Sequence, residues 1–321
     1  MIHLHGQFLG VDVDLSADCE LLSQVLKQAF PLFPRSDRAL ADPSFSIRFR
    51  SAKKPSLASR ALSPYCVVVH ETGGAKPAAG PRALGCRIYR DRGRLIFDLG
   101  SKGAFVLDCG EGTVEGEIVC PEMMATDVQG GIMHFSLTEV LKRYGIFHVH
   151  ASCVARGGHA VLFPGPSGSG KTTSSQAMVR AGFGFLADDC TLVHAVAGRV
   201  EVIPLPTHPK ILSRTEELLP GTARRLREKG LEKANATAFR LRLVVVPKIT
   251  GESRSCMEPI PPAAALRELL PQSLLISDPA IARAQFDTLA ALVASARCYR
   301  LRFGRDVEAL PDLIGSALEQ A

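Results

Sequence analysis

The feature that most constrains this chain is a glycine-rich loop between an apolar strand and a helix. Residues 165–172 read Gly-Pro-Ser-Gly-Ser-Gly-Lys-Thr, a full match to the GxxxxGK[ST] phosphate-binding loop, or Walker A motif. The motif needs a buried strand before it and a helix after it, and the sequence predicts them at His159–Phe163 and Thr172–Ala181. A further strand, Phe183–Ala187, follows. This order of elements is typical of an α/β nucleotide-binding core.

Each position of the loop has a physical task. The glycines let successive backbone N–H groups converge on a phosphate, because no Cβ stands in the way. The helix that follows directs its positive end toward the same anion. We expect Lys171 to reach the β- and γ-phosphates and the Thr172 hydroxyl to ligate Mg²⁺. The residues predicted to bind ATP, the default donor, are Gly165, Pro166, Ser167, Gly168, Ser169, Gly170, Lys171, Thr172 and Thr173.

Two adjacent carboxylates, Asp188 and Asp189, follow the predicted strand Phe183–Ala187. Carboxylates at a strand end beside a phosphate loop lie where the metal and the attacking nucleophile must be. One can hold Mg²⁺, and the other can accept the proton of an attacking hydroxyl. Because adjacent residues of a regular strand point to opposite faces, the strand must break there for both to face the site. The alternative is a polar strand end that caps a turn.

A histidine, His150, precedes the loop on the predicted strand Ile146–Val154. A lone histidine in a strand usually has a structural role. This strand, however, must lie beside the phosphate loop, so we keep His150 as a candidate catalytic residue. We interpret His159, His194 and His208 as structural or surface residues.

The character of the sequence changes near Gly130-Gly131. The first 125 residues predict a mostly β fold with one or two helices, and they contain no chemical motif. A helix over 133–144 then leads into the strands around the phosphate loop. We predict an N-terminal β-rich α+β domain over 1–128, with substrate recognition as its candidate role, and a P-loop catalytic domain over 129–321.

Positive charge is concentrated in the second part of the chain. The net charge is +6, and the 15 basic and 15 acidic residues of 1–130 cancel. The stretch 205–242 holds 9 basic and 4 acidic residues, which suits phosphate or an acidic partner. A solvated helix face explains that stretch equally well. We expect no nucleic-acid partner, because basic and aromatic residues do not alternate and the chain has no Trp.

Cysteine usage and hydropathy bear on the compartment. The nine cysteines form no CxxC pair, so neither a zinc cluster nor a redox motif is indicated. The first residues lack the basic and apolar regions of a signal peptide, and no apolar run approaches the length of a membrane span. These features predict a cytoplasmic protein without a membrane partner.

The motifs together resemble the HPr kinase/phosphorylase family and its relatives with the phosphoenolpyruvate-carboxykinase-like fold. The resemblance runs from His150 to about Thr191. It rests on His150-Ala-Ser, an apolar strand, GPSGSGKTT, a helix, Ala181-Gly182 and Leu186-Ala187-Asp188-Asp189. It implies a mixed-sheet P-loop kinase core of the α/β class, ATP on the phosphate loop and His150 lining the site. It also implies Asp188 as acid/base on the substrate hydroxyl, and Asp189 with Thr172 as ligands of Mg²⁺.

The chain also departs from that family. It contains no LEIRG-like segment, and residues 205–242 offer only loose candidates for a phosphate-contacting cation: Lys210, Arg214, Arg240 and Arg242. It looks more like the HPr-kinase-like subgroup, some members of which phosphorylate serine in biosynthetic peptides. The oligomeric state stays open, with a homo-oligomer as one option.

These observations predict an ATP- and Mg²⁺-dependent phosphotransferase, a serine kinase by resemblance. Its expected acceptor is a hydroxyl, Ser or Thr of a peptide or small protein. One alternative is a small-molecule hydroxyl kinase on the same core, and another is a nucleotide-binding switch without transfer. Pyrophosphate as donor stays open by family analogy. Nothing in the sequence separates the two kinase hypotheses, because specificity lies in loops that we cannot place.

Overall fold

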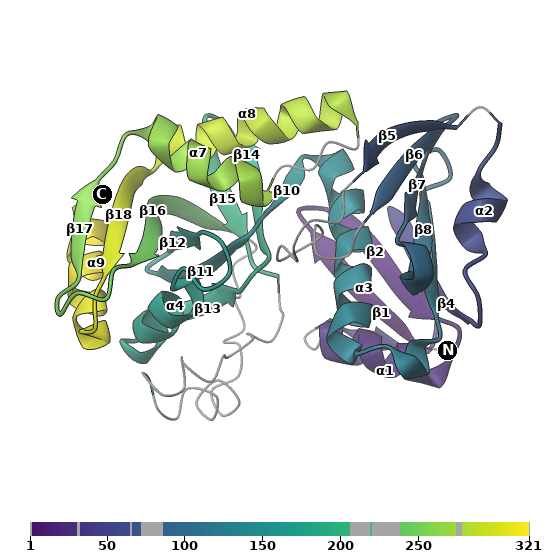
Figure 1. Ribbon diagram of the computed structural model, residues 1–321, viewed down its shortest axis with the longest axis horizontal. Coiled ribbons are helices and arrows are strands. Elements are labelled where there is room, and N and C mark those ends of the chain that lie inside the picture. The colour runs from purple at the N-terminus through teal and green to yellow at the C-terminus, as the bar shows by residue number, and fades with distance from the viewer. Residues whose placement is uncertain are drawn as a thin grey trace. The chain divides into compact units, whose positions relative to one another are not determined.

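A computed structural model describes residues 2–30, 33–64, 66–71, 86–205, 219, 238–273 and 278–320. The chain forms two compact units, one of residues 1–144 with 275–282 and one of residues 145–274 with 283–321. Each unit combines helices with a mixed sheet (Figure 1). The fold is therefore mixed α/β, with one sheet in each unit.

The first unit contains a mixed sheet whose strands follow the order β3-β1-β2-β4-β9-β8-β7-β6-β5. The pairs β2–β4 and β4–β9 are parallel, and the other pairs are antiparallel. Its elements are β1 (His3–Phe8), β2 (Val11–Ala17), α1 (Glu20–Ala29), β3 (Arg35–Ser36), β4 (Phe45–Ala52), α2 (Leu57–Ala61), β5 (Val67–Glu71), β6 (Arg87–Asp91), β7 (Arg94–Asp98), β8 (Gly103–Asp108), β9 (Thr113–Val119) and α3 (Thr126–Leu141).

Helix α3 begins earlier than predicted and packs on α1 of the first unit. The Gln129 side chain donates to the carbonyls of Pro121 (2.7 Å) and Met124 (2.9 Å), which anchors the first turn well before residue 133. The helix ends in a 3-10 turn, Lys142–Tyr144. The predicted domain division after residue 128 stays a prediction, whereas the compact units divide between Tyr144 and Gly145.

A buried carboxylate on β9 holds helix α2 in place. Glu117 is 1% exposed. It accepts hydrogen bonds from the backbone N–H groups of Ser56 (2.7 Å) and Leu57 (2.9 Å), at the start of α2. The Ser56 hydroxyl (2.7 Å) and the Arg50 guanidinium (3.1 Å) complete the set. Burial alone raises the pKa of Glu117, but these donors and the arginine charge hold it below its usual value.

The residue before this carboxylate is Gly116, and its lack of a side chain has a packing reason. A Cβ at Gly116 would come within 2.3 Å of the Phe49 ring on the neighbouring strand β4. The ring of Phe49 is fully buried. Glycine at this position therefore makes room for a core aromatic side chain.

The second unit has a sheet with the strand order β10-β14-β15-β16-β12-β11-β13, and β18 pairs with β16 and β17. The pairs β12–β16 and β16–β18 are parallel, so these three strands end at the same edge. Its elements are β10 (Ile146–Val149), β11 (Ala151–Arg156), β12 (His159–Pro164), α4 (Lys171–Arg180), β13 (Gly184–Ala187), β14 (Thr191–Val196), β15 (Arg199–Ile203), β16 (Phe239–Ile249), β17 (Cys256–Pro259), α7 (Pro262–Ser273), α8 (Pro279–Ser295), β18 (Arg297–Phe303) and α9 (Leu310–Glu319).

The predicted strand Ile146–Val154 is wrong as a single element. It divides at His150 into β10 and β11. Strand β10 pairs with β14, whereas β11 pairs with β12 and β13. The two halves therefore have different neighbours, and His150 lies at the point where the chain crosses between them.

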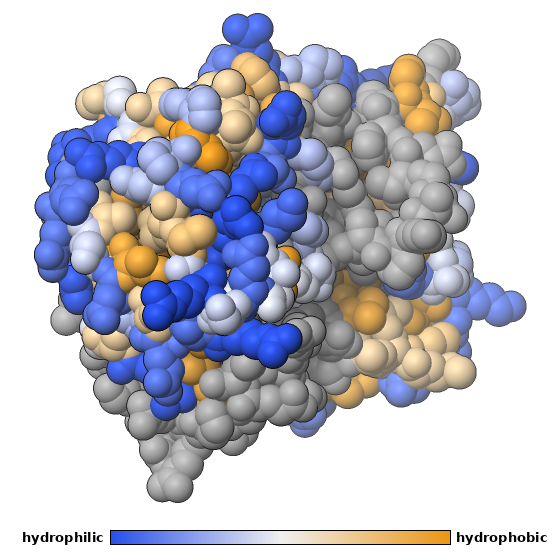
Figure 2. Space-filling model, turned by 60° about the vertical axis from the view of Figure 1, so that its left-hand side comes forward, coloured by the Kyte–Doolittle hydropathy of each residue, from blue (hydrophilic) through white to orange (hydrophobic). Residues whose placement is uncertain are grey.

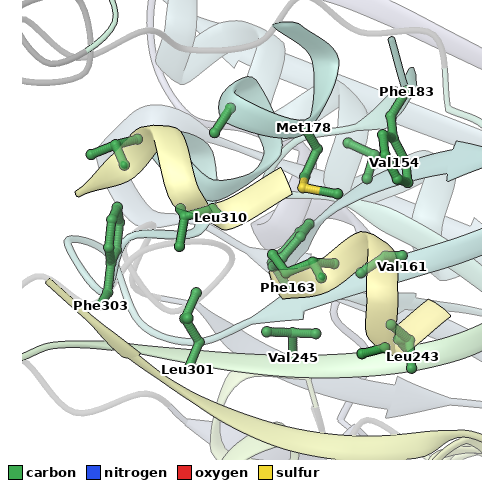
Figure 3. Close-up of a cluster of buried hydrophobic side chains, with 14 of the residues drawn as sticks. Val154, Val161, Phe163, Met178, Phe183, Leu243, Val245, Leu301, Phe303 and Leu310 are labelled. Carbon is green, nitrogen blue, oxygen red and sulfur yellow. The ribbon is translucent and has the colours of Figure 1, made fainter. Parts of the chain in front are cut away.

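Helices α4 and α9 cover one face of this sheet over a shared apolar core. Figure 3 shows Phe163 of β12, Leu301 of β18, Met178 of α4 and Leu310 of α9 turned toward one another. All four side chains are fully buried. The core lies beneath the phosphate loop, because β12 leads into that loop and α4 leads out of it.

On the face drawn in Figure 2, apolar side chains lie among hydrophilic ones. None of the helices in the described ranges is long and apolar enough to cross a membrane.

Candidate active site

The phosphate loop lies between β12 and α4, which confirms the predicted strand, loop and helix. Gly165, Gly168 and Gly170 have φ of +147°, +82° and +107°, a region that glycine adopts at little cost. A Cβ at Gly170 would also come within 2.5 Å of the Phe303 ring. The loop conformation therefore requires glycine at position 170 for two independent reasons.

The loop has unfilled hydrogen-bonding capacity. The buried hydroxyl of Ser169 has no hydrogen-bond partner among the described residues. Helix α4 begins at Lys171, so its first backbone N–H groups point back toward the loop. An anion cradled by the loop would satisfy such donors and benefit from the helix dipole. The loop thus fits a phosphate group on the evidence of its own geometry.

Lys171 and His150 form a contact inside the site. The Lys171 ammonium lies 3.3 Å from His150 Nε2 and donates to the Pro166 carbonyl at 3.2 Å. His150 Nδ1 lies 3.0 Å from the backbone carbonyl of Asp189, so we assign the proton to Nδ1 and the lone pair to Nε2. Burial and the Lys171 charge lower the pKa of His150, in agreement with a neutral ring.

Burial also lowers the pKa of the Lys171 ammonium, while the charges of Asp189 and Asp188 act in the opposite direction. Asp189 Oδ1 lies 3.7 Å from Lys171 Nζ and 3.9 Å from His150 Nε2. The sequence-predicted residues Lys171, His150 and Asp189 are therefore brought together.

The two aspartates sit at a sharp turn directly after β13. The Cys190 N–H donates to the Asp188 carbonyl at 2.7 Å, and Asp189 between them has a φ of +59°. A non-glycine residue in this region is uncommon and is often found at functional sites. The turn ends the alternation of side chains along β13. Such a break is required if both carboxylates are to face the same site.

Asp188 is the buried member of the pair. It is 6% exposed, whereas the Asp189 side chain is 48% exposed. The Thr172 hydroxyl lies 3.2 Å from both carboxylate oxygens of Asp188, and the Ser152 hydroxyl donates to Oδ1. Burial and, next, the Asp189 charge raise the pKa of Asp188 to about 6, although the hydrogen bonds from Ser152 and Thr172 and the Lys171 charge act in the opposite direction. A carboxyl group with such a pKa is suited to proton transfer near neutral pH.

The two candidate metal ligands, Thr172 and Asp189, have different neighbours in the site. The Thr172 hydroxyl contacts both carboxylate oxygens of Asp188, whereas the Asp189 carboxylate faces Lys171 and His150. Hydroxyl and carboxylate oxygens are the ligands that Mg²⁺ prefers. Across the described part of the chain, no group of three or more His, Cys, Asp or Glu side chains is arranged to hold a metal. A magnesium site here would therefore depend on the Thr172 hydroxyl and the aspartate pair.

Several cations and histidines named from the sequence lie elsewhere. Arg240 pairs with His159 at the start of β12 and β16, the end of these strands away from the phosphate loop, and Arg242 follows it on β16. His194 Nδ1 lies 2.9 Å from the Gly145 carbonyl, a structural contact. Lys210, Arg214 and His208 fall outside the described residues.

On the other side of the loop, the segments that follow β16 and β18 are tied together. Thr250 N–H donates to the Phe303 carbonyl (3.1 Å), and Arg305 N–H donates to the Glu252 carbonyl (3.0 Å). Asp306 accepts from the backbone and hydroxyl of Ser255 at 2.7 and 2.6 Å. The phosphate loop is thus flanked by the aspartates on one side and by this braced pair of segments on the other.

Sequence reasoning missed Ser152 and Phe303. Ser152 is fully buried on β11 and contacts Asp188, but the segment His150-Ala-Ser by itself does not indicate a contact between its serine and the aspartate pair. Only the antiparallel register of β11 and β13, which pairs Cys153 with Ala187, brings it to the carboxylate.

Comparisons with known proteins bear on the same stretch. The family described as SynChlorMet cassette protein ScmC matches residues 120–226, about a third of the chain, including His150, the phosphate loop and both aspartates. No curated protein matches the chain. Among solved structures, the HPr(Ser) kinase/phosphatase from Coxiella burnetii matches at 14% identity and a TM-score of 0.28, over 54% of this chain and 94% of that one.

Proposed function

We propose that this protein is an ATP-dependent phosphotransferase. It transfers the γ-phosphoryl group to a hydroxyl acceptor, Ser or Thr of a peptide or small protein. The observation that carries the proposal is the position of Asp188. A buried carboxylate with a raised pKa lies within 3.2 Å of the hydroxyl that opens the helix of a phosphate loop.

The loop residues Gly165 to Thr173 would hold the phosphates of the nucleotide, with backbone N–H groups and the orphaned Ser169 hydroxyl as donors. Lys171 would neutralise the transferred group. Its ammonium now contacts His150 and Pro166, and either contact can be exchanged for a phosphate oxygen. His150 would keep Lys171 and the Asp189 turn in register, since one ring nitrogen faces each.

Mg²⁺ fits the oxygen donors of Thr172 and the aspartate pair. When bound, it would neutralise charge on the phosphate oxygens. Asp189 is the more exposed carboxylate and remains our proposed ligand, together with Thr172.

Asp188 would act as the general base. The acceptor oxygen forms a bond to the γ-phosphorus as the bond to the β-phosphate oxygen breaks, and the acceptor proton passes to a carboxylate oxygen of Asp188. ADP and the phosphorylated hydroxyl are the products. Because Asp188 is buried beside the loop, the acceptor must insert its hydroxyl next to the loop to reach this carboxylate.

The test combines binding with transfer. Calorimetric titration of ATP with Mg²⁺ into wild type and Lys171→Ala should show binding that the variant loses. Transfer from γ-labelled ATP is then measured on serine- and threonine-containing peptides and, separately, on free hydroxy amino acids and sugars.

Label on peptides in wild type, absent in Asp188→Asn that still binds ATP, would support the proposal. Label only on small molecules would move the acceptor to that class. Binding with no transfer to any acceptor would favour a nucleotide-dependent switch. If wild type binds no nucleotide, the proposal fails at its first step.

A further inference from the structure

Ser152 contacts the proposed base without belonging to the phosphate loop or to the aspartate pair. It lies on β11, its side chain is fully buried, and its hydroxyl donates to Asp188 Oδ1. The strand register explains the contact. Cys153 pairs with Ala187 across the antiparallel β11–β13 ladder, so the residue before Cys153 lies across from the residue after Ala187.

The hydrogen bonds treat the two oxygens of Asp188 differently. Oδ1 accepts from the Ser152 hydroxyl and shares the Thr172 hydroxyl, whereas among the described residues Oδ2 has a hydrogen bond only with Thr172. A carboxylate rotates about its terminal torsion over a broad, roughly two-fold well unless partners hold it. Ser152 supplies that restraint from β11, which lies between β12 and β13, and Thr172 supplies it from the first turn of α4.

We propose that Ser152 is a positioning residue: its hydroxyl fixes the Asp188 carboxylate so that Oδ2 is the oxygen that takes the acceptor proton. The inference rests on the proposed phosphotransferase function. It assigns Ser152 no contact with nucleotide or acceptor. Its removal should therefore slow transfer and leave the binding of ATP almost unchanged, because a misaligned base affects the reacting geometry more than the ground-state complex.

Three variants test this role: Ser152→Ala, Ser152→Thr and the control Ser136→Ala. Ser136 is equally buried, but it lies on α3 in the first unit and donates to the Met133 carbonyl at 2.9 Å. Ser152→Ala should lower kcat for transfer to the serine peptide about tenfold and change KM for ATP by less than about twofold. Ser152→Thr keeps the hydroxyl and should recover most of kcat. Ser136→Ala should keep the native kcat.

A second readout does not depend on activity. Thermal unfolding midpoints of Ser152→Ala, Asp188→Ala and the double variant form a cycle. If Ser152 holds Asp188, removing the serine should lower the midpoint in wild type and have a smaller effect where Asp188 is already gone. Should Ser152→Ala not fold, Ser152→Cys, which nearly preserves volume and is a weaker donor, replaces it in both measurements.

The outcomes separate this role from the proposed function. A native kcat in folded Ser152→Ala, or additive midpoint changes in the cycle, would overturn the positioning role alone. A parallel rise of KM for ATP would also overturn it, because that result indicates damage to the phosphate loop. A wild type that binds ATP and transfers nothing would overturn the proposed function and, with it, any role of Ser152 in transfer.

Discussion

Glu117 in the first unit and Asp188 in the second are both buried carboxylates that accept a serine hydroxyl, yet their surroundings differ. Glu117 receives two backbone N–H groups and an arginine. Asp188 receives hydroxyl donors and has another carboxylate as its sequence neighbour. Burial acts to raise the pKa of both carboxylates. The pKa of Glu117 nevertheless lies below its usual value, whereas that of Asp188 is raised to about 6.

The difference separates a structural carboxylate from a reactive one. Fixed hydrogen-bond donors replace the water that would solvate the Glu117 carboxylate. They stabilise its ionised form and attach α2 to the sheet. At Asp188 the hydroxyls of Ser152 and Thr172 and the Lys171 charge only partly offset burial and the Asp189 charge, so the folded protein holds this carboxylate in a state that readily takes a proton. The same exchange of an acid for its amide should therefore have opposite effects at the two positions.

The largest expected effect is on transfer. Asp188→Asn should lower the rate of phosphoryl transfer about a thousandfold, because the amide cannot accept the proton. Glu117→Gln should leave the rate per folded molecule unchanged. The check is label transfer from γ-labelled ATP, with folded protein quantified by circular dichroism. A native rate in Asp188→Asn would remove the basis for calling this carboxylate reactive.

A second pair of variants compares the glycines beside these sites. Gly170→Ala forces a side chain into a φ of +107° and against Phe303, so we expect ATP binding to weaken about a hundredfold. Gly116→Ala forces a methyl against Phe49 in a regular strand and should lower the unfolding free energy by about 2 kcal/mol, with ATP affinity retained in the folded fraction. Calorimetry and denaturant titration separate the two effects. Equal losses of ATP affinity would contradict the distinction.

Stability gives a third, smaller contrast. Glu117→Gln removes charge-assisted hydrogen bonds and should destabilise the protein by about 2 kcal/mol near neutral pH. Asp188→Asn removes an unfavourably buried charge and should stabilise it by about 2 kcal/mol at about pH 8. Chemical denaturation of both variants against wild type measures the signs. Destabilisation by both would show that the Asp188 charge is well compensated in the folded state.

The smallest effect is the pH dependence of these differences. Because the pKa of Glu117 is depressed in the folded state, its stabilisation is present above the unfolded pKa and is lost as pH falls through the folded one. The pKa of Asp188 is raised, so its penalty is absent at low pH and develops as pH rises toward about 6. Unfolding free energies measured between about pH 3 and about pH 8 should show the Glu117→Gln deficit shrink toward acid and the Asp188→Asn gain grow toward base. Parallel curves would contradict both assignments.

The sequence predicts the part of the second unit that local signals determine. Glycines, flanking apolar runs and helix pattern identify β12, the phosphate loop and α4 almost residue by residue. The break after Ala187 also follows from the adjacent aspartates, since both could not otherwise face the loop. These features depend on residues that are close together in the sequence, so the sequence pattern alone predicts them.

What the sequence does not display is pairing between distant strands. The split at His150 occurs because β10 and β11 pair with different strands. In the sequence, the two halves together have the pattern of one continuous strand. Glu117 belongs to no motif, and the segment His150-Ala-Ser indicates no contact for Ser152. The two residues become informative only when the register of β11 with β13, or the approach of α2 to β9, places donors around a carboxylate.

The position of β12 in its sheet has a consequence for how the protein is made. This strand ends at Pro164, but its parallel neighbour β16 begins at Phe239, and the Phe303 ring that packs on Gly170 belongs to β18. Pairings of such long sequence separation form slowly, because loop closure precedes any stabilising contact. During synthesis the phosphate loop would emerge long before its supporting strands. Nucleotide binding would therefore begin late in folding, once β16 and β18 have joined β12 in the sheet.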